Sequence, residues 1–214
     1  MIDVVRERLA QVREKIARIR NPDDLVIVAV TKGFGADTCR AALAAGLRVL
    51  GENRVHEAIL KMDEVPDAEW HLIGHLQTNK VRQAAGRFAL IHSVDSVRLA
   101  TQLARVKPDQ AVLLEINVAR EPQKHGADPD RAQEMIKEIA SFVDLRGLMA
   151  MGPSHGDPAP AFRELRQMRD EAEQRLGKSL PVLSMGMSGD FEVAVAEGST
   201  MLRLGQALFG PRPS

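Results

Sequence analysis

Short apolar runs alternate with longer amphipathic segments along most of the chain. The apolar runs predict strands at residues 25–30, 48–51, 70–74, 89–93, 111–117, 145–150, 181–184 and 201–204. Apolar residues at helical spacing predict helices near 36–45, 53–63, 78–86, 95–105, 128–142, 159–177 and 189–197. A further helix is predicted at the start, where one apolar stripe comprises Ile2, Val5, Leu9, Val12, Ile16 and Ile19.

Strands that alternate with helices predict a parallel sheet. Eight such units in 214 residues favour a single (β/α)₈ TIM barrel, although an open doubly wound sheet would show the same alternation. Residues 152–161 are rich in Gly and Pro and fit one long loop after a strand. Because no linker, repeat or low-complexity stretch divides the chain, residues 1–214 are expected to form one domain.

Charge and cysteine content narrow the class of protein. Lysine and arginine together number 29, as do aspartate and glutamate, so no basic excess is available for nucleic acid or an anionic membrane. The single cysteine, Cys39, cannot form an internal disulfide, which favours a reducing compartment. Charged residues interrupt the first apolar runs, so no signal peptide or membrane span is expected. These features predict a cytoplasmic protein.

A lysine follows the first predicted strand. In a TIM barrel the chemistry lies at the carboxyl ends of the strands, and Lys32 comes just after the apolar run 25–30. A lysine at the mouth of a barrel loses hydration, which favours the neutral amine that attacks a carbonyl group. Lys32 is therefore either a surface lysine at a strand end or a lysine that forms a Schiff base.

The stretch 184–205 carries polar and small residues after the last two predicted strands. Ser188 precedes Gly189 and Asp190 and is predicted to cap the following helix, with its N-terminus facing the rim. Loops after strands seven and eight commonly bind phosphate in this fold, and Gly205 lies in the second of them. Ordinary turns are the alternative. Arg203, within an apolar strand, needs either a carboxylate partner or a ligand in the mouth of the barrel.

Several other polar residues follow the predicted strands. Glu52 and Asn53 are interpreted as possible caps of the next helix, and His71 as a hydrogen-bonded core histidine. His75, at the end of a predicted strand, is a candidate ligand contact, and a residue without a ligand is the alternative. The set of His56, His71 and His75 does not predict a metal site, because no cysteine or paired carboxylate joins it at ligand spacing.

Seven stretches in order resemble one known family. They are VAVTKGF, LGENRVHEA, WHLIGHLQTNK, IHSVDS, INVAREPQKHG, LRGLMAM and LSMGMSGDFEVAVAEGSTMLRLGQALFGPR, and they span nearly the whole chain. On these motifs the chain resembles the pyridoxal phosphate (PLP) homeostasis proteins of the YggS/PLPBP type. The resemblance implies a (β/α)₈ barrel like the N-terminal domain of alanine racemase, a fold type III protein, with an extra N-terminal helix.

The resemblance also implies a cofactor and the residues that bind it. Lys32 would hold PLP as an internal aldimine, and Arg203 would face the pyridine nitrogen. The implied phosphate contacts are Ser188, Gly205 and Gln206, and the implied neighbours of the cofactor ring are Asn53 and Met185. Gln206 stands where the family often has a small hydroxyl residue, and Arg54 where an aromatic residue is frequent.

The sequence leaves three classes of function open. The resemblance favours a non-catalytic protein that holds PLP, acts in vitamin B6 homeostasis and so affects amino-acid and keto-acid balance, with PLP-dependent apoenzymes as partners. A PLP-dependent amino-acid racemase is the alternative, but the tyrosine base of alanine racemases lies in a further domain, and this chain contains no tyrosine. A class I aldolase would use the lysine without PLP. A monomer is expected, because no extra domain or long apolar patch is visible.

Overall fold

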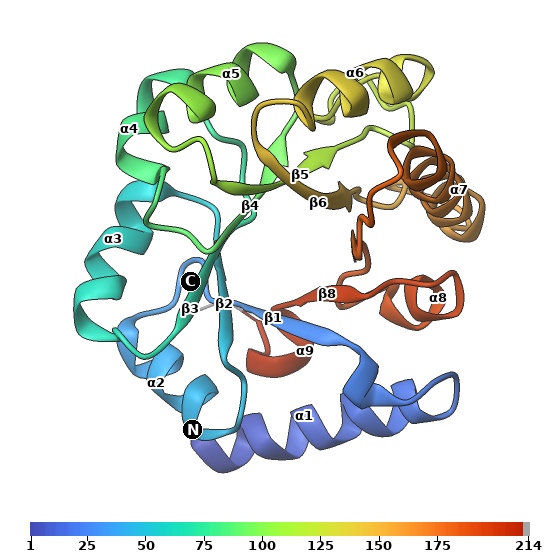
Figure 1. Ribbon diagram of the computed structural model, residues 1–214. Helices are drawn as coiled ribbons and strands as arrows, with labels where there is room; N and C mark the ends of the chain where they lie inside the picture. The colour runs from blue at the N-terminus through green and yellow to red at the C-terminus, as the bar shows by residue number, and fades with distance from the viewer. Residues whose placement is uncertain (212–214) are drawn as a thin grey trace.

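A computed structural model describes residues 1–211 of the chain. Within these residues, eight parallel strands close into a barrel in sequence order, and helices surround it (Figure 1). The strands are β1 Val26–Val30, β2 Val49–Glu52, β3 Glu69–Leu72, β4 Leu90–Val94, β5 Ala111–Glu115, β6 Asp144–Met149, β7 Val182–Ser184 and β8 Met201–Leu204. The predicted (β/α)₈ barrel is therefore confirmed, and the open sheet is excluded.

The helices follow the predicted positions with differences at their ends. The α-helices are α1 Ile2–Ala17, α2 Ala36–Ala44, α3 Val55–Glu64, α4 Val81–Ala84, α5 Val97–Val106, α6 Ala132–Ile139, α7 Ala159–Leu176, α8 Phe191–Ala196 and α9 Gln206–Phe209. Short 3₁₀ turns lie at η1 Pro22–Asp24, η2 Thr78–Lys80 and η3 Pro129–Arg131. The predicted helix at 78–86 is thus mostly a 3₁₀ turn and a single α-helical turn, and α9 was not predicted.

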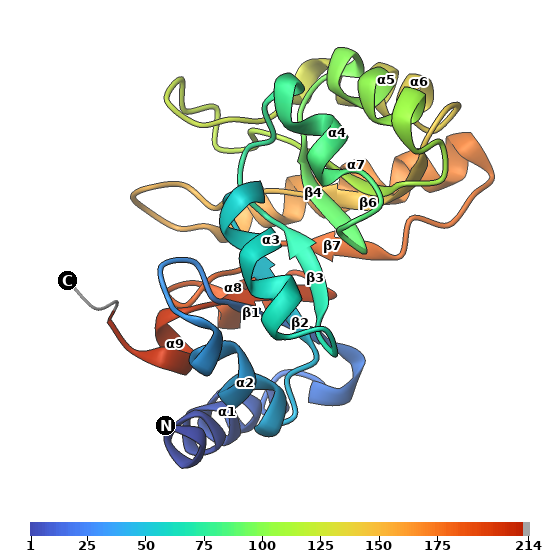
Figure 2. The ribbon, with the colours of Figure 1, turned by 90° about the vertical axis from the view of Figure 1, so that its left-hand side faces the viewer.

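The barrel closes where β8 pairs in parallel with β1. Val28 lies opposite Arg203 in this pairing, and on its other side Val28 lies opposite Val49 of β2. Because all strands run in parallel, their carboxyl ends share one rim, where the loops after β1, β5 and β6 project together (Figure 2). Residues from distant parts of the sequence therefore meet on this rim.

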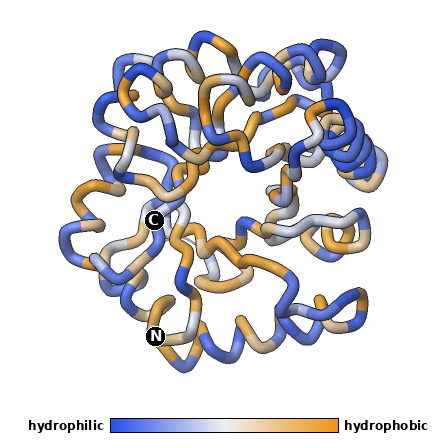
Figure 3. Tube along the Cα trace, viewed as in Figure 1, coloured by the Kyte–Doolittle hydropathy of each residue, from blue (hydrophilic) through white to orange (hydrophobic). Residues whose placement is uncertain are grey.

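The strands are buried on both faces, as their continuous apolar runs predict. One large apolar cluster lies between the strands and the surrounding helices and includes the fully buried Phe162 and Leu114. A separate cluster fills the barrel interior and comprises Val28, Leu90, Leu113, Met149 and Met201. The tube in Figure 3 shows apolar segments in the inner ring and strongly hydrophilic stretches on α7.

The N-terminal helix covers the junction between the first and last βα units. α1 contacts α2, α8 and α9, and buries Val5, Leu9, Val12 and Ile16 along one stripe. Since α9 is a single turn, α1 supplies the apolar face that covers this part of the barrel. In the part of the chain that the structure describes, none of the helices has the length and apolar character needed to span a membrane.

Candidate functional site

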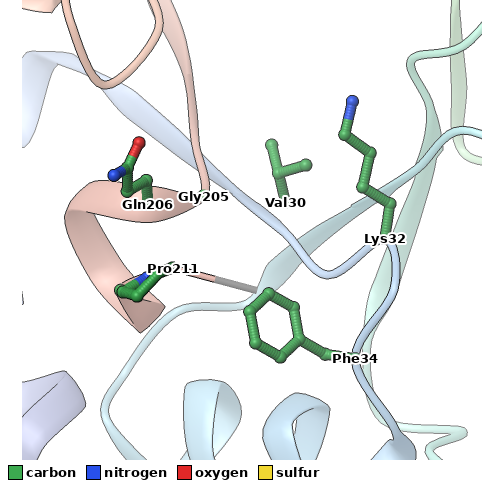
Figure 4. Close-up of a pocket in the computed structure, with 7 residues that line it drawn as sticks. Val30, Lys32, Phe34, Gly205, Gln206 and Pro211 are labelled. Atoms are coloured by element: carbon green, nitrogen blue, oxygen red, sulfur yellow. The ribbon is translucent and has the colours of Figure 1, made fainter. Parts of the chain in front are cut away.

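Lys32 lies in the turn that follows β1, at the rim of the barrel. The Phe34 N–H donates to the Thr31 carbonyl oxygen at 3.0 Å, so residues 31–34 form a β-turn with Lys32 and Gly33 at its centre. Gly33 has a φ of +77°, which a type II turn requires at its third position and which glycine adopts without strain. The Lys32 side chain extends from this turn into the pocket region (Figure 4).

A buried carboxylate at the end of β2 is hydrogen-bonded to the first residue of the turn. Glu52 is fully buried, and its Oε1 accepts hydrogen bonds from Thr31 Oγ1 at 2.6 Å and from Lys61 Nζ at 2.7 Å. Lys61 Nζ also donates to the Thr31 carbonyl oxygen at 3.0 Å. The hydroxyl and the carbonyl of Thr31 are therefore both tied to this ion pair, which fixes the residue directly before Lys32.

Gly33, on the other side of the turn, is connected to Lys61 through Glu57. Glu57 Oε1 accepts from the Gly33 N–H at 2.9 Å and from Lys61 Nζ at 2.8 Å. We call Thr31, Glu52, Glu57 and Lys61 the turn network. Burial raises the pKa of Glu52. Burial also opposes the charge of Lys61, but its hydrogen bonds to the two glutamates leave its pKa raised, so the ammonium stays charged at neutral pH.

A pocket of about 300 Å³ opens beside the Lys32 turn. Its lining comes from the ends of β1 and β8 and from the chain around α9, and comprises Val30, Lys32, Phe34, Gly205, Gln206, Gly210 and Pro211. Lys32 lies on one side and Gln206 on the other, with Val30 and Gly205 between them (Figure 4). The structure thus brings together Lys32, Gly205 and Gln206 of the predicted site residues.

Ser188 adjoins this pocket in a way that differs from the prediction. The helix after β7 begins at Phe191, its N-cap is Asp190, and Asp190 Oδ1 accepts from the Met187 N–H. The predicted N-cap role of Ser188 is therefore wrong. Ser188 Oγ instead accepts from the Ala207 N–H at 3.0 Å, in the first turn of α9. This bond joins the loop after β7 to Ala207, which follows the pocket residue Gln206, and it leaves the serine hydroxyl hydrogen for an outside acceptor.

Arg203 is buried near the end of β8, with its guanidinium bonded to the two preceding strands. Nη1 donates to the Ser184 carbonyl oxygen at 2.6 Å and to Ser184 Oγ at 2.7 Å, and Nη2 donates to the Ala150 carbonyl oxygen at 2.9 Å. Burial lowers the pKa of Arg203 to about 10, against the attraction of Glu115 and Asp190. Arg203 is therefore a charged donor at neutral pH.

Burial shifts the pKa of the Glu115 carboxyl group upward, whereas it shifts that of Arg203 downward. Glu115 ends β5, is only 3% exposed, and shares the inward-facing parity of Leu113 in the interior cluster. Burial raises its pKa to about 7, although the charge of Arg203 acts to lower it. The sequence reasoning missed this residue, because a glutamate at a strand end is ordinarily exposed.

A chain of hydrogen bonds runs from Arg203 through the barrel interior. Ser184 Oγ lies 2.9 Å from His92 Nδ1, and His92 Nε2 lies 3.0 Å from His71 Nδ1. His71 Nε2 in turn lies 2.9 Å from Oε1 of Glu69, the first residue of β3. We call these five residues the axial chain. It connects the site to Glu69, whose side chain is 54% exposed at the opposite end of the barrel.

The two ends of the axial chain have fixed roles as hydrogen-bond donor and acceptor. Arg203 can only donate, and the hydrogen bond from His71 lowers the pKa of Glu69, so the Glu69 carboxylate only accepts. Burial lowers the pKa of His92 well below its ordinary value, so this ring is neutral. In the tautomers with hydrogen on Nε2 of both rings, every bond points from Arg203 toward Glu69. The prediction of His71 as a hydrogen-bonded core histidine is confirmed.

The remaining predicted residues lie outside the Lys32 pocket lining. Asn53 lines a neighbouring pocket of about 380 Å³ with Arg54, His56, His75 and Lys80. The side chain of Met185 is fully buried in the cluster between strands and helices, directly after Ser184. The prediction that Glu52 or Asn53 caps the next helix is wrong, because the N-cap of α3 is Arg54 and no side chain caps that helix.

The site has the features that a phosphorylated aldehyde requires. An amine and small residues face one pocket, a serine hydroxyl adjoins it, and a buried arginine lies on β8, the strand that ends just before Gly205. The three Arg203 bonds described above use three of its five N–H groups, so donors remain for a ligand. The residues present therefore fit PLP.

The barrel and its site define the alanine racemase N-terminal domain class. The family model described as "Alanine racemase, N-terminal domain" matches residues 3–213. An alanine racemase from Corynebacterium glutamicum superposes with a TM-score of 0.80 at 16% identity, over 100% of this chain and 62% of the racemase chain. At that identity the similarity shows the fold alone.

Closer relatives specify the family. A pyridoxal phosphate homeostasis protein from Aquifex aeolicus is 39% identical over 222 residues, which are 96% of this chain and 97% of that protein. PipY from Synechococcus elongatus PCC7942 superposes with a TM-score of 0.88 without PLP and 0.86 with PLP bound, at 38% and 37% identity. Both matches cover 96% of this chain and 100% of the PipY chain. The chain belongs to the pyridoxal phosphate homeostasis protein family.

Proposed function

We propose that this protein binds PLP and holds it as an internal aldimine on Lys32. The observation that carries the proposal is the turn network, which presents Lys32 at a pocket opposite Gly205 and Gln206. PLP supplies an aldehyde, whose carbon forms a double bond to the lysine nitrogen with release of water. The PLP-bound structure of PipY, 37% identical to this chain, supports the binding of PLP.

The phosphate and the ring are assigned to different parts of the rim. Ser188 Oγ–H, with the chain at Gly205 and Gln206, binds the phosphate, because the bond from Ala207 leaves the serine hydroxyl hydrogen to donate. Arg203 donates to the pyridine nitrogen.

Asn53 and Met185 stay proposed neighbours of the ring. Asn53 lines the neighbouring pocket, and Met185 directly follows Ser184, which holds Arg203.

The proposed role is to hold and release PLP without turnover. The protein then acts in vitamin B6 homeostasis and indirectly in amino-acid and keto-acid balance, and PLP-dependent apoenzymes are its proposed partners. The names of its relatives support this, since they are homeostasis proteins rather than enzymes. We further propose that residues 1–214 form one PLP-binding domain that acts as a monomer in the cytoplasm.

Borohydride reduction followed by peptide mapping tests the central assignment. The purified protein is expected to be yellow, and reduction is expected to fix the cofactor on the peptide that contains Lys32. Lys32→Ala should lose the aldimine absorbance band. Label on Lys80 or Lys124 instead would contradict the assignment. A colourless protein that binds no PLP would favour the aldolase.

A further inference from the structure

A second group of side chains lies on the rim, outside the lining of the Lys32 pocket. His75, Asp95 and His125 lie in the loops after β3, β4 and β5, which are successive strands of the barrel. The ligand atoms of these three residues all lie within 4.8 Å of one another, and His75 Nδ1 lies 3.3 Å from Asp95 Oδ2. The rings of His75 and His125 stack at a centroid distance of 4.2 Å with 11° between their planes. We call this group the rim triad.

We infer that the rim triad binds a divalent transition-metal ion of the Zn²⁺ class. Two imidazole nitrogens and one carboxylate oxygen are donors that Zn²⁺, Co²⁺ and Ni²⁺ share, whereas Mg²⁺ and Ca²⁺ favour oxygen donors. Three protein ligands leave at least one coordination position open to water or another ligand. The inference does not depend on PLP, because none of the three residues lines the Lys32 pocket.

The backbone around His75 and Asp95 is fixed by close contacts. Ser93, two residues before Asp95, donates from its buried Oγ to the Gly74 carbonyl oxygen at 2.6 Å. Gly74 packs so tightly that a Cβ at this position would lie 2.4 Å from the Asn53 carbonyl oxygen. The residue before His75 is therefore held between β2 and β4. The short distance between the side chains of His75 and Asp95 is therefore set by the packing of the strands that precede them.

The loop that carries His125 is held as firmly. Ala127 N–H donates to the Glu115 carbonyl oxygen at 2.7 Å, and Asn117 N–H donates to the Ala127 carbonyl oxygen at 3.0 Å. Lys124 Nζ donates to the Gly152 carbonyl oxygen at 2.6 Å. Bonds on both sides of His125 thus fix the backbone of this loop, which lowers the entropic cost of bringing His125 to an ion.

The donor atoms and the stacked rings of the rim triad must move when an ion binds. Zn–N and Zn–O bonds are about 2.0–2.2 Å long, so the donor atoms must approach one another from their present spacing. Two nearly parallel rings cannot both aim a nitrogen at one ion, so the stack must open by rotation of the side chains. His75 and Asp95 have 37% and 19% of their side chains exposed, which leaves room for this rotation.

Titration of the chelator-treated, tag-free protein with Co²⁺ and Zn²⁺ tests the inference. We expect one saturable equivalent, visible as a Co²⁺ absorption band that Zn²⁺ displaces and Mg²⁺ does not. His75→Ala, Asp95→Asn and His125→Ala should each weaken Zn²⁺ binding in calorimetry by at least about tenfold, the loss that even an outer-shell change causes. His155→Ala, which removes an exposed histidine outside the triad, should bind like the wild type.

The controls separate this site from the cofactor site. Lys32→Ala should keep full Zn²⁺ affinity even if it loses PLP, so the two proposals fail independently. Circular dichroism should show that the triad variants keep the fold. The inference is overturned if no single saturable equivalent is found, if the triad variants bind as tightly as the wild type, or if Lys32→Ala or His155→Ala abolishes binding.

Discussion

Arg203 Nη1 donates to both oxygens of Ser184, the carbonyl oxygen at 2.6 Å and Oγ at 2.7 Å. Ser184 Oγ in turn lies 2.9 Å from His92 Nδ1, so one hydroxyl is hydrogen-bonded to both the arginine and the imidazole. The position of the charged Arg203 side chain near the end of β8 is therefore linked to a neutral ring deep in the barrel. Removal of either neighbour of the hydroxyl breaks the same chain of bonds.

Ser184→Ala and His92→Phe are each expected to lower the free energy of unfolding, and their effects should not be additive. Each change leaves a buried polar group without its partner, which costs about 1–3 kcal/mol. Because the two residues share one bond, the double variant should lose about 1 kcal/mol less than the sum of the single losses, measured by urea unfolding. Ser199→Ala is the control, since Ser199 is equally buried but bonds to backbone carbonyls outside this chain. Additive losses for Ser184 and His92 would contradict the hydrogen bond between them.

The barrel and the position of Lys32 were predictable from the sequence for physical reasons. Strands buried on both faces appear as continuous apolar runs, and a lysine directly after such a run marks the rim. The axial chain was not predictable in the same way, because it joins residues as far apart as His92 and Ser184. Lys61 was also missed, since a lysine on a short helix ordinarily faces solvent.

Ser188 shows how a local pattern can predict the wrong contact. Serine, glycine and aspartate before an apolar run form a good N-cap signal, which predicts that Ser188 caps the following helix. The hydroxyl bonds instead to Ala207 of α9, a helix too short to produce a periodic pattern. The competing tertiary contact was therefore invisible in the sequence, although the position at the rim was predicted.

Lys61→Met is expected to cost about 3–5 kcal/mol of stability, because it leaves the carboxylate of Glu52 buried without a counter-charge. Glu52 is fully buried, and its Oε2 has no hydrogen-bond partner within residues 1–211. Glu52→Gln combined with Lys61→Met should recover part of the loss, because the uncompensated charge is gone. Lys15→Met, at an ion pair whose two side chains are about half exposed, should change stability by less than about 1 kcal/mol. A Lys61 variant as stable as the Lys15 variant would contradict the role of the turn network.

Glu115→Gln is expected to stabilise the protein at pH 8 and to have little effect at pH 4. The folded pKa of Glu115 is raised to about 7 from 4.5, so its contribution to stability is fully present below pH 4.5 and is lost as the pH rises through 7. The wild type should lose up to about 3 kcal/mol over this interval, and the glutamine variant should not. Urea unfolding across this pH range measures the difference. A constant difference between the two proteins at all pH values would show that burial of the charge is not the cause.

Ser188→Ala is expected to weaken PLP more than pyridoxal, because only PLP carries the phosphate that the hydroxyl is proposed to bind. One hydrogen bond to a charged group contributes about 1.5–3 kcal/mol, which corresponds to a tenfold or larger loss of affinity. Ser188→Thr should restore much of the difference, since it keeps a hydroxyl that can also accept from Ala207. Binding is measured by the absorbance change on titration with each aldehyde. Equal weakening of both would assign Ser188 a structural role only.

The protein is expected to exchange the α-proton of amino acids slowly or not at all. Racemisation requires the cofactor ring to take up a developing carbanion, which a protonated pyridine nitrogen does best. Arg203, which burial leaves with a pKa of about 10, stays charged and can only donate, so a nitrogen beside it remains an unprotonated acceptor. A two-base racemase also needs an acid or base on the far face of the ring, and the tyrosine used by alanine racemases has no counterpart in a chain without tyrosine. Incorporation of solvent deuterium into L-alanine, followed by proton NMR, measures this exchange. Rates typical of enzymes, about 1–10³ s⁻¹, would overturn the non-catalytic assignment and favour the racemase.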